Sequence, residues 1–179
     1  MHSRIDRISE LFETAGKGMF TLLTQLTMRE DIAEELMQEL FIKLVRFKNL
    51  DKVDNLETYA RQAAVSLALD WRKKHKLQTL SLQKAAKLPS DENPPLSKLV
   101  EDEQLQKVLD AIGELKGLPR DAFVMRYVQQ QPYNDIAAQL GKTPHQIRAL
   151  CHKALNHLRF LLSGGDLPPS KKGDSHVSD

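Results

Sequence analysis

Apolar residues recur every three or four positions along most of this chain, which is the spacing of one face of an α-helix. The first set lies close to the N-terminus and comprises Ile5, Ile8, Leu11, Phe12 and Ala15. Gly16 and Gly18 then interrupt the pattern, and a second apolar stretch covers 19–26. No stretch predicts a strand, and the composition is dominated by residues that favour helix, such as Leu, Ala, Gln, Lys and Glu. The fold class is therefore predicted to be all-α.

The next stretch predicts a long amphipathic helix. Thr27 and Glu30 have the spacing of a capping box, in which each side chain satisfies a backbone N–H, so we expect Thr27 to cap this helix. The apolar stripe behind this cap comprises Ala33, Leu36, Met37, Leu40, Phe41, Leu44 and Val45. Acidic residues and Gln38 occupy the other faces, which predicts one buried side and one charged side.

A polar turn at 48–55 leads to a third long helix. Its candidates for the buried face are Leu56, Tyr59, Ala60, Ala63, Ala64, Leu67 and Trp71. The end of this helix is strongly basic through Arg72, Lys73, Lys74 and Lys76. No carboxylate occurs between Trp71 and Lys87. Because the formal net charge of the chain is only +2, any interaction with nucleic acid must depend on where such charges lie.

Two small helical domains are predicted, joined by a flexible linker. The linker is expected at 78–98, because helical periodicity fades there and prolines cluster. We expect the N-terminal domain at 1–77 and the C-terminal domain at 99–162, where Pro119 is suited to the first position of a helix. The tail at 163–179 is rich in Gly, Pro, Ser, Lys and Asp, which is typical of a disordered segment. The sequence leaves open whether the two domains pack together.

Several features argue against secretion and membrane insertion. Cys151 is the only cysteine, which excludes an internal disulfide framework and is typical of a reducing compartment. No apolar run approaches the roughly 20 residues that span a bilayer, and the N-terminus has no signal-peptide pattern. A cytoplasmic location is therefore expected.

An enzyme is the least supported class of function. Cys151 and His152 are adjacent, so their side chains diverge around a helix and form no nucleophile–base pair. His145, His152 and His157 lack the spacing of a metal site, and no Gly-rich phosphate loop occurs. We expect no catalytic residue, no cofactor and no metal.

A helix-turn-helix is the strongest local signal in the chain. Pro132 is suited to open a short helix, and Gly141 is suited to end it in the left-handed conformation. Thr143 then has the position of an N-cap, Pro144 that of the first helical residue, and Gln146 completes a capping box.

The second helix of this motif carries charge of one sign. No acidic residue occurs between Ile136 and Gly165, whereas Lys142, Arg148, Lys153 and Arg159 are basic. Such a face suits the major groove of DNA, and a solvated basic face is the alternative. Arg148 is the preferred base reader, because Arg grips guanine with two hydrogen bonds, and Lys153 is the preferred phosphate contact. Gln146 is either a base contact or only a cap.

Three parts of the chain resemble one family. The first is D-I-A-E-E-L-M-Q-E-L-F at 31–41, and the second is V-S-L-A-L-D followed by W-R-K-K at 65–74. The third consists of L-P-R-D-A-F-V-M-R-Y and Y-N-D-I-A within 118–137, together with the recognition helix at 147–159. In this order and spacing they resemble the small, two-domain extracytoplasmic-function group of bacterial sigma factors, which are sigma-70-like. The resemblance covers roughly 19–162.

The resemblance implies a protein that binds core RNA polymerase and promoter DNA. It implies that the acidic helix docks on the helical clamp of the largest polymerase subunit through Asp31, Glu34, Glu35, Gln38 and Phe41. It implies that the loop 48–55 and the third helix capture the opened −10 strand, with contacts from Tyr59, Arg61, Ser66, Arg72, Lys73, Lys74 and Lys76. The recognition helix would read the −35 element through Thr143, His145, Gln146, Arg148, Ala149, His152 and Lys153. An anti-sigma factor is a further partner that the resemblance suggests.

Three positions depart from the family's pattern. Ser66 stands where the family has Asn, and Lys153 stands where Arg is usual. Trp71 replaces a smaller or aliphatic residue, and we interpret it as a core anchor rather than a base-stacking residue. These departures affect which promoter sequence we would expect the chain to recognise more than they affect the expected function.

Two other functions compete with this interpretation. A helix-turn-helix transcription regulator would need a sensory or phosphoacceptor domain, and 1–77 shows no alternation of strands and helices that would build one. A helical adaptor would bind a partner protein without promoter activity. The three hypotheses differ in whether the chain shifts promoter DNA alone, only with core polymerase, or never.

Overall fold

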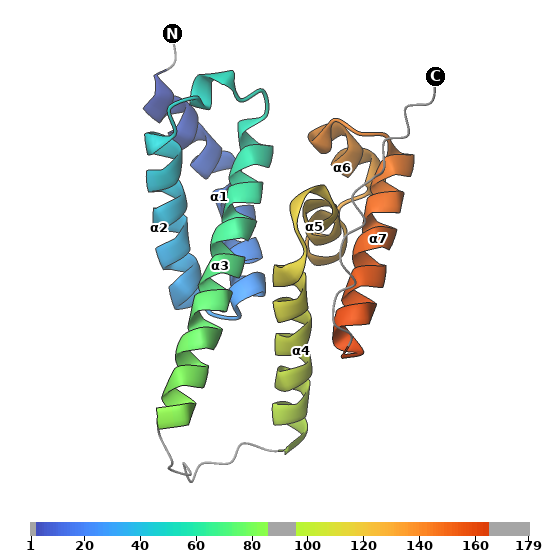
Figure 1. Ribbon diagram of the computed structural model, residues 1–179. Helices are drawn as coiled ribbons and strands as arrows, with labels where there is room; N and C mark the ends of the chain where they lie inside the picture. Colours follow the sequence, from blue (N-terminus) through green and yellow to red (C-terminus); the bar gives the residue numbers. More distant parts are fainter. Residues whose placement is uncertain (1–2, 86–95, 165–179) are drawn as a thin grey trace, which may run out of the picture.

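The computed structural model describes residues 3–85 and 96–164, with side chains at 3–78 and 103–164. Within these ranges the chain forms helices and no strand, so the predicted all-α class is confirmed (Figure 1). In chain order the elements are α1 (Arg4–Thr27), α2 (Glu30–Arg46), the short 3-10 helix η1 (Leu50–Lys52), α3 (Leu56–Ala85), α4 (Leu96–Glu114), α5 (Gly117–Phe123), the π-helical turn η2 (Val124–Val128), α6 (Tyr133–Leu140) and α7 (Pro144–Leu162).

The stretch at 78–98, where we expected a linker, is helical at both ends. Helix α3 continues to Ala85 and α4 begins at Leu96, so only 86–95 lies between them, outside the described residues. The expected disordered tail also lies outside them from 165 onward. Loss of apolar periodicity did not end the helix, because the Leu, Gln, Lys and Ala residues that close α3 have favourable helix propensities.

The N-terminal apolar residues form one continuous helix, so the predicted interruption at Gly16 and Gly18 is wrong. Helix α1 spans 24 residues and is capped by Ser3, whose hydroxyl accepts a hydrogen bond from the Asp6 amide at 3.2 Å. A Cβ atom at Gly16 would lie 3.9 Å from Phe12 and 4.0 Å from Met37, so α2 packs closely against α1 at this point. Burial of the helix on both sides of the two glycines offsets their low helix propensity.

The predicted capping box between Thr27 and Glu30 is also wrong. Helix α1 includes Thr27, which is buried, and its hydroxyl donates to the Leu23 carbonyl at 2.8 Å. Met28 then takes a left-handed conformation with φ of 60°, and Arg29 is the N-cap of α2 without a side-chain hydrogen bond to the helix start. The apolar stripe of α1 runs through Leu26, which keeps the threonine inside the first helix.

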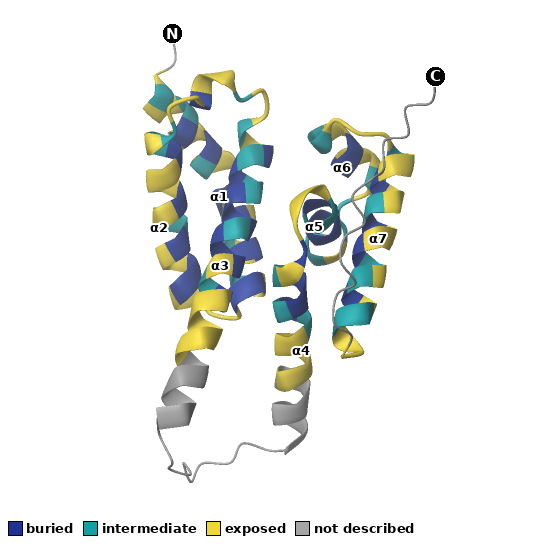
Figure 2. Cartoon of the chain, viewed as in Figure 1, coloured by how far each residue is buried: buried dark blue, intermediate teal, exposed yellow. Residues whose placement is uncertain are grey.

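Helices α1, α2 and α3 form a three-helix bundle around a common core. The largest side chains that are fully buried in it are Ile8, Met19, Leu22, Leu23, Leu26, Leu40, Leu44 and Leu50. Figure 2 shows the buried stripes of these helices turned toward one another. Phe41, which was predicted in the apolar stripe of α2, lies at its edge with 37% of its surface exposed. Its ring meets that of Phe12 edge-on, with the centroids 5.4 Å apart.

The C-terminal half packs α5, η2, α6 and α7 around a smaller core. The buried residues of this second cluster are Ala122, Met125, Ile136, Ala137, Ile147 and Cys151. Helix α5 begins at Gly117 rather than at Pro119, because Gly117 takes a positive φ of 64° and turns the chain out of α4. Pro119 still lies in the first turn, where the missing N–H has no carbonyl to bind.

The two halves pack together along α3 and α4, which answers the question that the sequence left open. One apolar cluster runs from Ile8 in α1 to Leu158 in α7. Figure 1 shows α3 and α4 side by side, with α5 to α7 beyond α4. Arg72 of α3 is only 7% exposed and donates 2.7 Å hydrogen bonds to side-chain oxygens of Gln106 and Asp110 in α4.

None of the helices in the described ranges has the length and apolar character that a membrane crossing requires.

Leu40→Ala should lower the free energy of unfolding by about 2–5 kcal/mol, because it leaves a cavity at the centre of the bundle. Ile42→Ala, on the same helix but at a position that is 47% exposed, should change it by less than about 0.5 kcal/mol. Chemical denaturation followed by circular dichroism measures both. Equal losses in the two variants would contradict the packing of α2.

Candidate nucleic-acid interface

The turn between α6 and α7 has the geometry that the sequence predicts. Gly141 ends α6 with φ of 61°. The Thr143 hydroxyl accepts a hydrogen bond from the Gln146 amide at 3.2 Å, and the Gln146 side chain accepts one from the Thr143 amide at 3.0 Å. Pro144 is the first residue of α7. The capping box and the helix-turn-helix are therefore confirmed, and the Gln146 side chain is committed to the cap.

The exposed face of α7 carries most of the predicted −35 contacts. Ile147 and Cys151 are buried in the second apolar cluster, whereas Ala154 and Leu158 are buried in the larger cluster that includes residues of α4. The remaining face points away from the core and exposes His145, Gln146, Arg148, Ala149, His152 and Lys153. Within the described part of α6 and α7 after Asp135, no carboxylate lies near this face. The charged side chains of this face, Arg148 and Lys153, are therefore both basic.

The exposed residues of α7 divide between two sides of the helix. On the side toward α6, the Arg148 guanidinium lies over the Tyr133 ring, 5.3 Å from its centroid. On the side toward the start of α5, Gln146, Ala149 and Lys153 line a depression of about 390 Å³ with Leu118 and other residues. The sequence pattern placed all of them on one polar face and did not distinguish these two sides.

The single cysteine is buried under the recognition helix. The Cys151 thiol donates to the Ala122 carbonyl at 3.6 Å, and burial raises its pKa above the ordinary value of 9.0. A thiol that is both buried and harder to ionise is a poor nucleophile. In the ranges with described side chains, no group of three or more His, Cys, Asp or Glu residues is placed to hold a metal ion.

The predicted −10 contacts on the first half of α3 lie in three different surroundings. Tyr59 stacks on Phe47 from the loop after α2, with the ring centroids 4.9 Å apart. Arg61 forms an ion pair with Glu57 one turn earlier at 2.6 Å. The Ser66 hydroxyl accepts a hydrogen bond from Arg120 of α5 at 3.2 Å. The C-terminal half therefore covers Ser66.

The basic run of α3 from Arg72 to Lys76, which we expected at the end of the helix, lies near its middle, because α3 continues to Ala85. Its side chains also lie in different surroundings. Arg72 is buried under α4, and Lys76 reaches Asp110 of α4 at 2.9 Å. Lys73 and Lys74 are exposed and form no ion pair with any residue of the described ranges. The structure therefore places two cations of the run against α4 and leaves two toward solvent. The sequence did not identify Asp110 as their partner, because a single carboxylate on a helix gives no indication of which cation it will pair with.

The predicted polymerase contacts share one exposed stripe on α2, and we call this set the α2 stripe: Asp31, Glu34, Glu35, Gln38 and Phe41. The carboxylate of Asp31 accepts hydrogen bonds from Arg29, which hold its pKa below the ordinary value of 3.8. Glu34, Glu35 and Gln38 point to solvent. The stripe combines negative charge with one aromatic edge, which suits a partner surface of mixed basic and apolar character.

Two family models match the chain in its two halves. Residues 11–78 match the model described as Sigma-70 region 2, and residues 105–158 match the model described as Sigma-70, region 4. Together the matches span more than half of the 179 residues. The chain belongs to the sigma-70 family. It is a sigma factor, which binds RNA polymerase and DNA and is not an enzyme.

Two relatives are similar over most of their length. The ferric citrate uptake sigma factor FecI of Escherichia coli (strain K12) is 24% identical over 157 residues, which are 87% of this chain and 91% of that protein. The sigma factor RpoE of Bartonella quintana, solved in complex with the anti-sigma factor NepR, shares 19% identity with a TM-score of 0.41. That match covers 87% of this chain and 96% of the other.

The sigma-70 matches correspond to the elements described above. The region 2 match includes α2 and the basic run of α3, and the region 4 match includes α5, α6 and most of α7. The competing interpretation as a regulator with a sensory first half is therefore wrong, because that half matches region 2. The domain boundaries and the individual contact residues of the sigma factor stay predictions.

Asp121 of this sigma factor joins the two halves and has an unusual environment. It is 8% exposed, and its carboxylate accepts hydrogen bonds from Gln62 of α3 at 3.1 Å and from the neighbouring Arg120. Burial raises its pKa above the ordinary value of 3.8, although Arg120 and Gln62 oppose this. Folding therefore favours the protonated form of this carboxyl.

This shift predicts a pH dependence of stability with a defined sign. The folded protein holds the Asp121 proton to a higher pH than the unfolded chain does. The contribution of this proton to the free energy of unfolding is therefore fully present at low pH. It is lost as the pH rises above 3.8 through the folded pKa. Asp121→Asn should remove this dependence, whereas Asp54→Asn, at an exposed position, should keep it. Denaturation curves over this pH range measure the free energy of unfolding. If the difference in this free energy between wild type and Asp121→Asn does not change with pH, the prediction is wrong.

Proposed function

We propose that this sigma factor directs core RNA polymerase to promoters through three surfaces. The α2 stripe docks on the helical clamp of the largest polymerase subunit. The loop before α3 and the basic run of α3 capture the opened −10 strand. Helix α7 reads the −35 element. The observation that carries the proposal is the capped helix-turn-helix, whose exposed face carries basic and no acidic side chains, in a chain that also matches region 2.

The geometry of α7 reduces the number of candidate base readers. Gln146 and Thr143 satisfy each other in the capping box, so their main role is to fix the start of the helix. Arg148 and Lys153 are exposed, and neither forms an ion pair within the described ranges. Their charges are therefore available to DNA. His145, Ala149 and His152 complete the exposed face near the start of α7.

Capture of the −10 strand requires a rearrangement of the two halves. In this conformation Arg72 donates its hydrogen bonds to α4, and Ser66 accepts one from α5. Lys73 and Lys74 remain exposed and provide phosphate contacts that need no such change. We therefore propose that the halves separate when α3 binds the opened strand. Binding of core polymerase and the −35 element would favour the separated form.

An anti-sigma factor as a partner and the cytoplasm as a location follow from the family resemblance, and both stay predictions. The helical adaptor without promoter activity is the remaining alternative. It predicts binding to a protein partner but no transcription from any promoter. Run-off transcription with purified core polymerase on a set of genomic promoters separates the two hypotheses.

Docking on polymerase is tested by reversing charge on the α2 stripe. Glu35→Lys combined with Gln38→Ala should weaken core binding by about tenfold or more, which corresponds to about 1.4 kcal/mol, while helicity is kept. Glu13→Lys, an exposed acidic position on α1, is the control for the change in charge alone. Titration of labelled protein with core polymerase measures the affinity. If the double variant stays folded and binds core as tightly as wild type, the docking assignment is wrong.

Base reading and phosphate binding are separated by two variants of α7. Arg148→Ala should lower affinity for the preferred −35 element by about 1–3 kcal/mol and relax discrimination at one base position. Lys153→Ala should instead weaken binding to all sequences nearly equally, because a phosphate carries no base identity. Titration of holoenzyme against singly substituted −35 elements measures both. A uniform loss in Arg148→Ala would transfer the reading role to His145, Ala149 or His152.

A further inference from the structure

Two arginines share one aromatic ring beside the recognition helix. The Arg126 guanidinium lies 4.6 Å from the centroid of the Tyr133 ring, and the Arg148 guanidinium lies 5.3 Å from the same centroid. Both distances are within the range of a cation–π interaction. Arg126 comes from η2, Tyr133 is the first residue of α6, and Arg148 lies in the second turn of α7. The ring therefore lies where the three elements meet.

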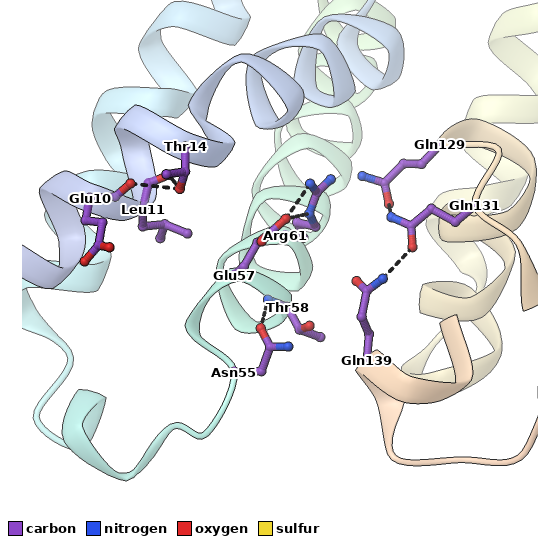
Figure 3. A network of polar contacts seen from close by, with 10 residues as sticks. All are labelled: Glu10, Leu11, Thr14, Asn55, Glu57, Thr58, Arg61, Gln129, Gln131 and Gln139. Carbon is purple, nitrogen blue, oxygen red and sulfur yellow. Dashed lines mark hydrogen bonds and ion pairs between the residues drawn. The ribbon is translucent and has the colours of Figure 1, made fainter. Parts of the chain in front are cut away.

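The Tyr133 ring is held on several sides. It packs against the second apolar cluster, which includes Ile136 of its own helix and Ile147 of α7. The loop before it is fixed by a chain of side-chain amides. Gln139 of α6 donates to the side chain of Gln131 at 2.9 Å, and Gln131 donates to that of Gln129 at 3.3 Å (Figure 3).

Arg126 and the backbone make the same loop rigid. The Arg126 guanidinium donates to the Gln131 carbonyl at 3.0 Å. Gln130 takes a positive φ of 56°, which is uncommon for a residue with a side chain and persists only where the surroundings enforce it. These contacts hold the loop that leads into Tyr133, and the ring itself packs against the second apolar cluster, so Tyr133 offers a defined platform for the side chain of Arg148.

The nature of the contact matters for DNA recognition. Arg148 forms no ion pair with a carboxylate of the described ranges, and the ring is its assigned partner there. A carboxylate would occupy the N–H donors of the guanidinium and would repel DNA phosphates. The face of a ring attracts the cation through its quadrupole and leaves the planar fork of donors open. A ring is therefore suited to orient an arginine that must still bind another molecule.

We propose that Tyr133 is a positioning residue for −35 recognition, whose ring holds the Arg148 guanidinium on the side of α7 that faces α6 while its donors stay available to the DNA. This inference rests on the proposed reading role of Arg148. Tyr133 itself need not touch a base. Its effect on base selectivity should pass through Arg148 and should follow the electron density of the ring rather than its shape.

The test replaces Tyr133 with a graded series of rings in the full-length chain. Tyr133→Phe keeps the ring and should change selectivity for the −35 element by less than about twofold. Phenylalanines with one, two and three ring fluorines keep nearly the same shape but weaken the negative face. Selectivity should fall stepwise along this series, by about two- to fivefold in total, as expected for an exposed cation–π contact. Holoenzyme binding to preferred and singly substituted −35 elements measures it.

The same series in the Arg148→Ala background is the matched control, and there fluorination should have no effect. If selectivity is flat along the series while Arg148→Ala alone lowers it, Tyr133 does not position Arg148 and the inference is overturned. An equal slope in both backgrounds also overturns it, because the ring then acts independently of Arg148. If Arg148→Ala changes no affinity, the proposed reading role fails instead. Because the fluorinated rings preserve packing, unfolding does not obscure these outcomes.

Discussion

The buried guanidinium of Arg72 is the contact around which the two halves of this sigma factor are arranged. It donates to Asp110 and Gln106 of α4, and more weakly to the Leu26 carbonyl at 3.4 Å, so it joins the end of α1 and the middle of α3 to α4. A buried charge is tolerated only while its partners remain, because removing one of them leaves the other charge without compensation. The Arg72–Asp110 pair therefore requires α4 to lie against α3.

The proposed function requires this arrangement to be reversible, and a buried ion pair is compatible with that. Taking a charge pair out of water costs about as much as the pair regains, so a buried ion pair determines an arrangement without adding much net stability. When the halves separate, water or a phosphate can replace Asp110 as the partner of Arg72. Under the proposed function, DNA and α4 thus compete for one guanidinium. Closure and −10 binding are then mutually exclusive for this residue.

The sequence correctly predicted a local feature where the residues that determine it lie close together in the chain. Thr143 caps α7 as expected, whereas Thr27, with the same spacing to its partner, does not cap α2. The difference is that Gly141 ends the preceding helix, while Leu26 continues the buried stripe of α1 through Thr27. Helical periodicity predicted the fold class and the recognition helix. The contacts between halves could not be predicted, because Asp110 and Asp121 look like any surface carboxylate until α3 lies beside them.

The recognition helix illustrates how neighbouring polar residues divide two tasks. The side-chain oxygen of Gln146 accepts a hydrogen bond from the Thr143 amide, so this acceptor is occupied by the cap. Arg148 is oriented by the Tyr133 ring, which uses none of its donors. A side chain satisfied by hydrogen bonds within the protein contributes to the helix, and one held by a ring remains available to a ligand. Under the proposed function, the type of internal partner, more than the exposure of the residue, therefore separates the capping position from the DNA-reading position on this face.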